Sequence, residues 1–139
     1  MQLADTSVWV WTRAVGGQLR ADYDKAVVDG TIATCAMVRL ELLYSARDAG
    51  EFADLRADLS ALPDLAIDAA QWDRALEVYA RLSQQGGMHH RSVKHPELLI
   101  AAAAEAAGVE LLHYDEDYDR IAAITGQPVR WLAPRGSLR

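Results

Sequence analysis

The chain has 139 residues, of which 51% are hydrophobic and 24% are charged, a balance typical of an ordinary folded domain. Its 20 acidic residues against 14 Lys and Arg give a formal net charge of -6, which argues against a broad basic surface for nucleic acid. The composition excludes intrinsic disorder, and the length suits one domain over residues 1–139 with a polar tail from about residue 134.

One cysteine and short apolar stretches indicate the cellular context that we expect. Cys35 stands alone in the apolar run TIATCAMV, so we interpret it as a small core residue of a protein from a reducing compartment. No stretch approaches about 18 uninterrupted apolar residues, and Asp5 interrupts the segment that a signal peptide would need. We therefore expect a cytoplasmic protein without a membrane span.

The hydrophobic pattern predicts strands that alternate with helices. An apolar strand over residues 1–4 ends at Asp5, and residues 8–11 fit a strand or a helix equally well. A helix ending at Gly30, a β-branched strand over 31–35 and a helix through 37–44 follow. Two amphipathic stripes then predict a helix stopped by Pro63 and a second helix closed by residues 86–87, with a short strand at 65–67 between them. The stripes are Phe52, Leu55, Leu59 and Leu62, and Trp72, Leu76, Tyr79 and Leu82.

The last third of the chain continues the alternation. Residues 88–95 are polar and loop-like, and Pro96 opens an alanine-rich helix that runs to Gly108. A strand over 109–114, a helix around 121–125 and a strand over 129–132 follow. Strands separated by helices imply an α/β protein with a parallel sheet covered on both faces, whose ligands gather at the carboxyl ends of the strands.

Acidic residues follow two of these predicted strands. Asp5 comes directly after the first strand, and Asp115 comes after the 109–114 strand with Asp117 two residues later. These acids would lie at one edge of the sheet if the strands are parallel. Capping of the following helices is the alternative interpretation of Asp5 and Asp115, because aspartate is common at helix starts.

Two glutamates are further candidates. Glu41 interrupts the apolar segment MVRLELLY, where a carboxylate costs on the order of several kcal/mol unless a cation meets it. That cation could be a distant arginine or a bound metal ion, since Arg39 points elsewhere on a helix. Glu97 falls in the first turn of its helix, where the helix dipole alone would favour an acid.

Taken together, these acids predict a metal site at one edge of the sheet. Oxygen ligands suit Mg²⁺, for which Mn²⁺ can substitute, and clustered carboxylates raise one another's pKa values unless a divalent ion neutralises them. Such a site can activate water and stabilise the charge that develops during phosphodiester cleavage. The candidate metal-ligating and catalytic residues are Asp5, Glu41, Glu97, Asp115 and Asp117.

The polar segment before Glu97 contains histidines and cations. His89, His90 and His95 lack a zinc-type set of partners, so the sequence disfavours a zinc site. Arg91 and Lys94 are candidates for contacts with RNA phosphates near the acids, and a solvated loop is the alternative.

The chain resembles the PIN-domain ribonuclease family, and within it the VapC toxins of bacterial toxin–antitoxin pairs. The resemblance covers nearly the whole chain and rests on the segments LADTSVWV, RLELLYSA and HPELLIAAAAEAAGVELLHYDEDYDRIA. The last segment is its most specific part. The resemblance implies a PIN-like three-layer α/β/α sandwich with a short, mainly parallel central sheet.

The resemblance also implies roles for individual residues. Thr6 or Ser7 would support the first acid, and Glu97 stands where the family usually has aspartate. The longer side chain keeps the charge but could weaken metal binding or the rate, because productive positioning is needed within about 0.5 Å. The family's other acids fall on Asp5, Glu41, Asp115 and Asp117.

The activity implied by the resemblance is that of a Mg²⁺-dependent endoribonuclease that cleaves structured RNA, often tRNA, and slows growth. A cognate VapB-like antitoxin and a homodimer are implied as well.

One alternative to this activity is a catalytically degenerate PIN fold that binds an antitoxin or RNA. An aspartyl-phosphate enzyme with Asp5 as nucleophile is disfavoured, because Ser7 stands where its second acid would be needed. The net charge of -6 does not exclude RNA, because five of the 20 acids are assigned to one cation site.

Overall fold

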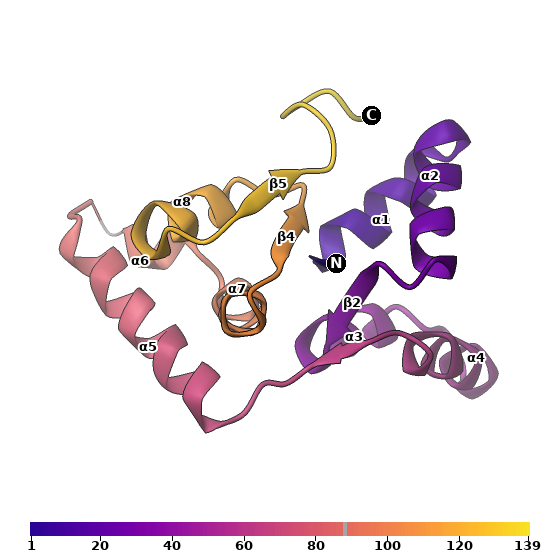
Figure 1. Cartoon of the computed structure of the whole chain (residues 1–139), viewed down its shortest axis with the longest axis horizontal. Coiled ribbons are helices and arrows are strands. Elements are labelled where there is room, and N and C mark those ends of the chain that lie inside the picture. The colour runs from indigo at the N-terminus through magenta and orange to yellow at the C-terminus, as the bar shows by residue number, and fades with distance from the viewer. Residues whose placement is uncertain (88) are drawn as a thin grey trace.

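A computed structural model of the chain describes residues 1–87 and 89–139, without the side chain of residue 89. Within these residues, a parallel five-stranded sheet has the order β3-β2-β1-β4-β5 (Figure 1). β1 lies at its centre, with Leu3 opposite Ala33 on one neighbour and Leu111 on the other. The strands are β1 (Gln2–Ala4), β2 (Ile32–Cys35), β3 (Asp64–Leu65), β4 (Glu110–His113) and β5 (Val129–Trp131).

Helices cover both faces of the sheet. Successive strand residues point to opposite faces, so Leu3 and Leu111 pack against one set of helices, whereas Ala4 and Leu112 pack against the other. α1 and α2 cover the second face, and α3, α5, α7 and α8 cover the first (Figure 1). The predicted three-layer α/β/α arrangement is therefore confirmed. The helices are α1 (Thr6–Val15), α2 (Gly17–Val28), α3 (Ala36–Tyr44), α4 (Ala49–Ser60), α5 (Ala69–Gln84), α6 (His89–Ser92), α7 (His95–Ala107) and α8 (Asp117–Thr125).

Several predicted boundaries differ from the structure. The ambiguous residues 8–11 are helical, and part of the segment expected to be a loop forms α6. α4 ends at Ser60 rather than at Pro63, because Ala61 and Leu62 close the last turn with bonds to carbonyls three residues back. α8 begins at Asp117, so this acid lies in the first turn of a helix. Met88 lies outside the described residues.

The face that α5 buries also differs from the predicted stripe. Trp72 and Leu76 are 55% and 65% exposed, whereas Ala75 and Val78 are buried together with Leu82. α5 packs along the buried helix α7, and its Ala75, Val78 and Leu82 side chains join the same core cluster as those of α7. The predicted stripe therefore located the helix correctly but placed part of its buried face wrongly.

Cys35 lies in the core, and the last residues of the chain contact the rest of the fold. Cys35 is a free, buried thiol in the core, and burial raises its pKa. Residues after β5 contact the turn after β4, where the Leu138 N–H donates to the Tyr114 hydroxyl at 2.9 Å and Arg135 pairs with Glu116. None of the helices in the described ranges is long and apolar enough to cross a membrane.

Candidate metal centre

Three of the predicted acids meet beyond the carboxyl end of β4. Glu97, Asp115 and Asp117 each present a carboxylate oxygen, and these oxygens lie within 4.8 Å of one another. They come from the first turn of α7, the turn after β4 and the first turn of α8. Asp5 and Glu41 lie close enough to be coupled to this cluster: beyond the larger effect of burial, the charge of Asp115 raises the pKa of Asp5, and the charge of Glu41 raises that of Glu97.

Asp5 is buried and is held by Ser7. Asp5 occupies the N-cap position of α1; its side chain forms no capping hydrogen bond of ordinary geometry, yet, against the larger effect of burial, the nearby Val8 N–H lowers its pKa, as expected of a capping acid. Its Oδ1 instead accepts a hydrogen bond from the Ser7 hydroxyl, which in turn accepts one from the Tyr114 N–H at 2.9 Å. Ser7 thereby ties the residue after β1 to the residue after β4.

Asp115 organises the turn after β4 and also faces the acidic cluster. Its Oδ1 accepts a hydrogen bond from the Asp117 N–H at 3.0 Å, which organises the start of α8. Its own N–H donates to Nδ1 of the buried His113 at 3.2 Å. Asp115 therefore shapes the turn after β4 and also presents an oxygen to the acidic cluster.

Glu41 is half-buried and is held by a hydroxyl group rather than by an arginine. Thr6 Oγ1 donates to Glu41 Oε1 at 2.8 Å, while Arg39 pairs with Asp64 at 2.9 Å. Among residues 1–87 and 89–139, none of the ion pairs that the structure defines includes Glu41. A distant arginine therefore does not explain this carboxylate.

Glu97 has the most unusual environment of the five. Its side chain is buried, and its Oε2 has no hydrogen-bond partner among the described residues. Burial, followed by the charges of Asp115 and Asp117, raises its pKa to about 7, against a smaller opposing effect of Lys94. A buried, unpartnered oxygen beside two further carboxylates fits a divalent cation.

The pKa values of Asp5 and Asp117 are raised as well. Burial raises the pKa of Asp5 to about 6, even though hydrogen bonding by Ser7 and Tyr118 lowers it. Burial and the charge of Asp115 raise the pKa of Asp117, although its Oδ1 accepts a hydrogen bond from Arg120 at 2.7 Å. The site thus holds more negative charge than its own cations neutralise.

Three residues of this region were missed from the sequence. Arg120 pairs with Asp117 one helical turn away, a spacing that the DYDR segment contains. His113 and Tyr118 are completely buried. A search of the sequence for clustered charges could not find them, because their positions are those of ordinary core residues, one in a strand and one in a helix.

The histidines do not form a metal site in the part of the chain that the structure describes. The rings of His90 and His95 each pack against Tyr79, with centroids 5.5 Å apart. The His89 side chain lies outside the described residues. The exposed Lys94 lies close enough to Glu97 to lower its pKa, and Arg91 is also exposed.

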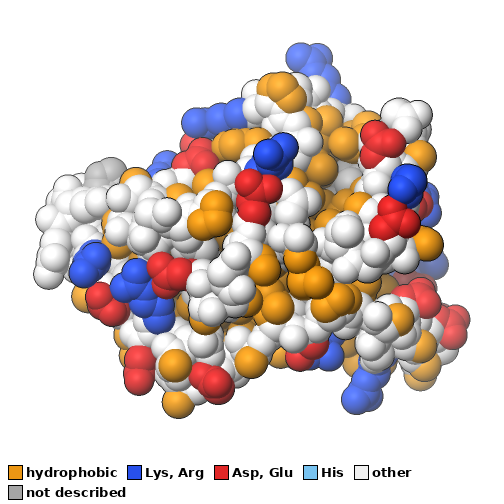
Figure 2. All heavy atoms as spheres, in the orientation of Figure 1, with side chains coloured by type: hydrophobic (Ala, Val, Ile, Leu, Met, Phe, Trp, Pro, Cys, Tyr) orange, Lys and Arg blue, Asp and Glu red, His pale blue; other side chains and the backbone are white. Residues whose placement is uncertain are grey.

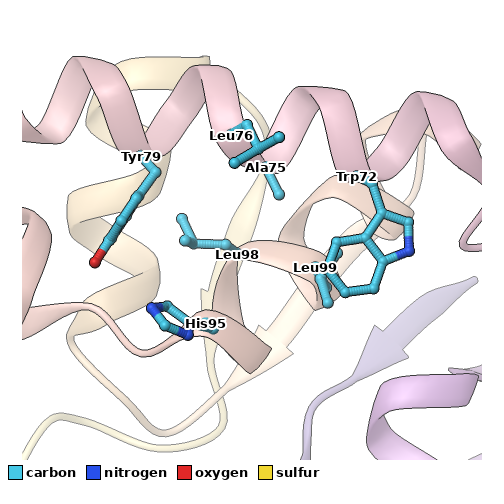
Figure 3. A pocket seen from close by; sticks show the side chains of 7 residues that line it. All are labelled: Trp72, Ala75, Leu76, Tyr79, His95, Leu98 and Leu99. Carbon is cyan, nitrogen blue, oxygen red and sulfur yellow. The ribbon is translucent and has the colours of Figure 1, made fainter.

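Two apolar surface features lie near the site but are not part of the acidic cluster. A groove between α5 and α7 is lined by aromatic and aliphatic side chains (Figure 3): Trp72, Ala75, Leu76, Tyr79, His95, Leu98 and Leu99. A shallow depression formed by α3 and the start of α1 contains Glu41 itself, beside Leu40 and Tyr44, which are 63% and 92% exposed. On the face shown in Figure 2, acidic and basic side chains are interspersed rather than gathered into one basic patch.

The fold and the site define an α/β/α protein with an acidic cluster at the carboxyl edge of its sheet. Residues 3–124 match the family described as PIN domain. The chain is 44% identical over 134 residues to Ribonuclease VapC18 of Mycobacterium tuberculosis, covering 96% of each protein. It is 41% identical over 109 residues to Ribonuclease VapC51 of the same organism, covering 78% of this chain and 77% of the relative. The chain therefore belongs to the PIN-domain family and to its VapC branch.

Solved structures agree with this fold. A chain of the DNA-bound VapBC from Salmonella typhimurium superposes with a TM-score of 0.73 at 17% identity, covering 95% of this chain and 98% of that one. A chain of VapBC-1 from nontypeable Haemophilus influenzae gives a TM-score of 0.72 at 13% identity, covering 94% and 97%. At these identities the likeness concerns the fold alone.

Proposed function

We propose that this protein is a Mg²⁺-dependent endoribonuclease that hydrolyses phosphodiester bonds in structured RNA, with tRNA as the expected substrate class, and acts as a growth-inhibiting toxin. The observation that carries the proposal is the cluster of Glu97, Asp115 and Asp117, in which one buried carboxylate oxygen has no partner among the described residues. The relatives named as VapC ribonucleases support the same reaction class.

The proposed roles follow from the contacts of each side chain. Glu97, Asp115 and Asp117 would hold the cation, and Asp5 and Glu41 would complete its surroundings. The bound ion would supply Lewis-acid stabilisation of the phosphate charge and a nucleophilic water. The hydroxyl groups of Thr6 and Ser7 hold Glu41 and Asp5 by hydrogen bonds, so that these carboxylates do not have to reorient when RNA binds.

Cations near the acids are proposed to bind the RNA backbone. Lys94 is exposed and lies near Glu97. Arg91 is exposed in α6, the short helix that precedes α7 in the chain. Lysine and arginine supply most of the affinity for phosphates. With a net charge of -6, and with acidic and basic side chains interspersed on the face shown in Figure 2, we expect weak and salt-sensitive RNA binding.

We further propose a VapB-like antitoxin as the protein partner and a homodimer as the assembly. The structural relatives include complexes titled VapBC and a toxin–antitoxin complex from Klebsiella pneumoniae. The exposed Leu40 and Tyr44 on α3, beside the carboxylate of Glu41, offer apolar contacts and a negative charge to a partner segment with basic residues. The exposed Trp72 and Leu76 on α5 are candidates for the contact between copies.

Asp5→Asn tests the proposed function. We expect purified wild-type protein to cleave RNA in Mg²⁺ but not in EDTA, and the variant to lose at least 100-fold in rate, on the order of losses at catalytic groups. Asp54→Asn, on the exposed face of α4, is the matched control and should retain wild-type activity. A folded Asp5→Asn variant with wild-type activity would refute the proposal.

Mn²⁺ calorimetry distinguishes the proposed ribonuclease from the alternative, a catalytically degenerate PIN fold. The degenerate fold predicts no ion site that depends on Asp5 and Asp115.

A further inference from the structure

We infer that the segment after β5, residues 132–138, is a strap that positions the acidic site by holding the turn that carries Asp115 and leads to Asp117. The inference rests on the proposed function and deepens it, because this turn supplies two of the three clustered acids. Arg135 of the strap is a positioning residue: it acts through Glu116 rather than by contact with the cation or with RNA.

The strap begins beside β4 and is redirected by a glycine. The Leu132 N–H donates to the carbonyl oxygen of His113 at 2.7 Å, so the strap starts next to the end of β4. Residues 134–137 then form a hydrogen-bonded turn in which Gly136 has a φ of 74°, a backbone conformation that is unfavourable for residues with a side chain. This turn redirects the chain, so that Leu138 reaches the residue that follows β4.

The strap holds the residues on both sides of Asp115. The Leu138 N–H donates to the Tyr114 hydroxyl at 2.9 Å. The Arg135 guanidinium pairs with the carboxylate of Glu116. Because both neighbours of Asp115 are anchored, few backbone conformations remain open to it, although the strap does not touch its side chain in either contact.

The contact with Glu116 continues to the second acid of the turn. Arg120 of α8 pairs with the other carboxylate oxygen of Glu116 at 3.3 Å and donates to Asp117 Oδ1 at 2.7 Å. Glu116 is therefore shared by two arginines, one from the strap and one from α8. Several charges in one network hold their members better than an isolated surface pair does. Without Arg135, we expect Glu116 and Arg120 to hold Asp117 less firmly.

Tyr114 links the strap to the first acid. Its ring contacts those of Trp11 and Trp131, with centroids 5.1 and 5.5 Å away. Its N–H donates to the Ser7 hydroxyl oxygen at 2.9 Å, and Ser7 donates in turn to Asp5. The strap is thus connected by an unbroken series of contacts to acids that follow both β1 and β4.

Arg135→Gln separates positioning from a simple effect of charge. Loss of a positive charge near the acids would by itself strengthen Mn²⁺ binding, whereas loss of positioning weakens it. We expect Mn²⁺ affinity, measured by calorimetry, to fall about 3- to 10-fold, and kcat for RNA cleavage to fall similarly with little change in KM. Arg135→Lys, which can still pair with Glu116, should restore most of both. Arg47→Gln, which removes an exposed ion pair with Glu51, is the matched control and should change neither.

Amide hydrogen exchange gives a readout that needs neither metal nor RNA. The N–H groups of Tyr114 and Asp117 donate to side chains of the site, so their exchange rates report how firmly the turn is held. In EDTA we expect both groups to exchange about 3- to 10-fold faster in Arg135→Gln, and faster still in a variant without residues 135–139. The control should exchange at the wild-type rate. Arg135 is 68% exposed, so its substitution should leave the protein folded.

Three results would overturn the inference while leaving the proposed function intact. They are wild-type exchange rates at Tyr114 and Asp117 in Arg135→Gln, Mn²⁺ affinity in that variant that is unchanged or higher, and a rise in KM with kcat unchanged. The last result would assign Arg135 to RNA binding instead. A wild-type protein that neither binds Mn²⁺ nor cleaves RNA would overturn the proposed function, and the inference with it.

Discussion

Individual carboxylates of this protein are placed where their charge is unfavourable without a cation. Glu97 is buried with an unpartnered oxygen and Asp5 is buried beside the Ser7 hydroxyl group, and burial is the main reason that both pKa values are raised. The grouping of acids in the sequence predicted such raised pKa values. It could not show that Arg120 partly neutralises Asp117, because that contact depends on side-chain directions at the start of α8.

The raised pKa values predict how stability depends on pH. In the metal-free folded protein the pKa is about 6 for Asp5 and about 7 for Glu97, above their ordinary values of 3.8 and 4.5. Their favourable contribution is therefore complete below about pH 4 and is lost as the pH rises towards 7, by roughly 3 kcal/mol for each group at most.

Urea unfolding in EDTA between pH 4 and pH 8 measures this dependence. The free energy of unfolding of wild type, relative to that of Glu97→Gln, should fall as the pH rises, because the glutamine cannot ionise. Parallel pH profiles for the two proteins would contradict the assignment of strain to Glu97. Glu51→Gln, an exchange at a less buried glutamate of α4, controls for general effects of charge.

Ser7→Ala is expected to weaken both the fold and the site. The substitution removes a donor to Asp5 and leaves the Tyr114 N–H without its acceptor, which should cost about 1–3 kcal/mol of unfolding free energy. Mn²⁺ affinity should fall with it, since Asp5 is then free to reorient. Ser83→Ala, which removes an exposed hydroxyl that bonds only to its own helix, should change neither quantity measurably.

At the scale of elements, hydrophobic periodicity located the helices better than it located their buried faces. The stripe through Trp72, Leu76 and Leu82 correctly predicted α5, yet two of these three side chains are exposed. The reason lies outside α5, because the side that is buried is the one that joins the core cluster containing α7. A single helix cannot contain that information.

The same substitution, leucine to alanine, at two positions on α5 tests which face of this helix is buried. Leu82→Ala should lower the free energy of unfolding by about 2–5 kcal/mol, because Leu82 is completely buried and the change leaves a cavity. Leu76→Ala, at a side chain that is 65% exposed, should change it by less than about 0.5 kcal/mol in the monomer. Equal effects in dilute protein would contradict the orientation of α5. A larger effect of Leu76→Ala only at high concentration would indicate that this face joins two copies.

At the scale of the whole molecule, sheet topology assembles the site. β1 lies between β2 and β4, so the residue after β1 and the turn after β4 share an edge, and α3 and α7 bring Glu41 and Glu97 to it. The alternation of strands and helices predicted a parallel sheet, and the positions of the acids in this pattern predicted the site residues, on which the motifs of the family also fall. Neither the strand order nor the identity of the partner for each carboxylate follows from periodicity, because both are set by long-range packing.

Cation binding should stabilise the whole fold. A ligand that binds only the folded protein adds about 2.7 kcal/mol when its concentration is 100 times its Kd. Thermal unfolding at pH 8 should therefore shift upward with Mg²⁺ or Mn²⁺, and the shift should be absent in Asp115→Asn. An equal shift in that variant would place the stabilising ion elsewhere.

The central claim is that Glu97, Asp115 and Asp117 hold one divalent cation. Anomalous X-ray diffraction from a crystal containing Mn²⁺ tests it most directly. We expect an anomalous peak between these three side chains, within about 2.0–2.5 Å of oxygens from at least two of them. A fully ordered site without a peak at saturating Mn²⁺, or a peak bound only by other residues, would contradict it.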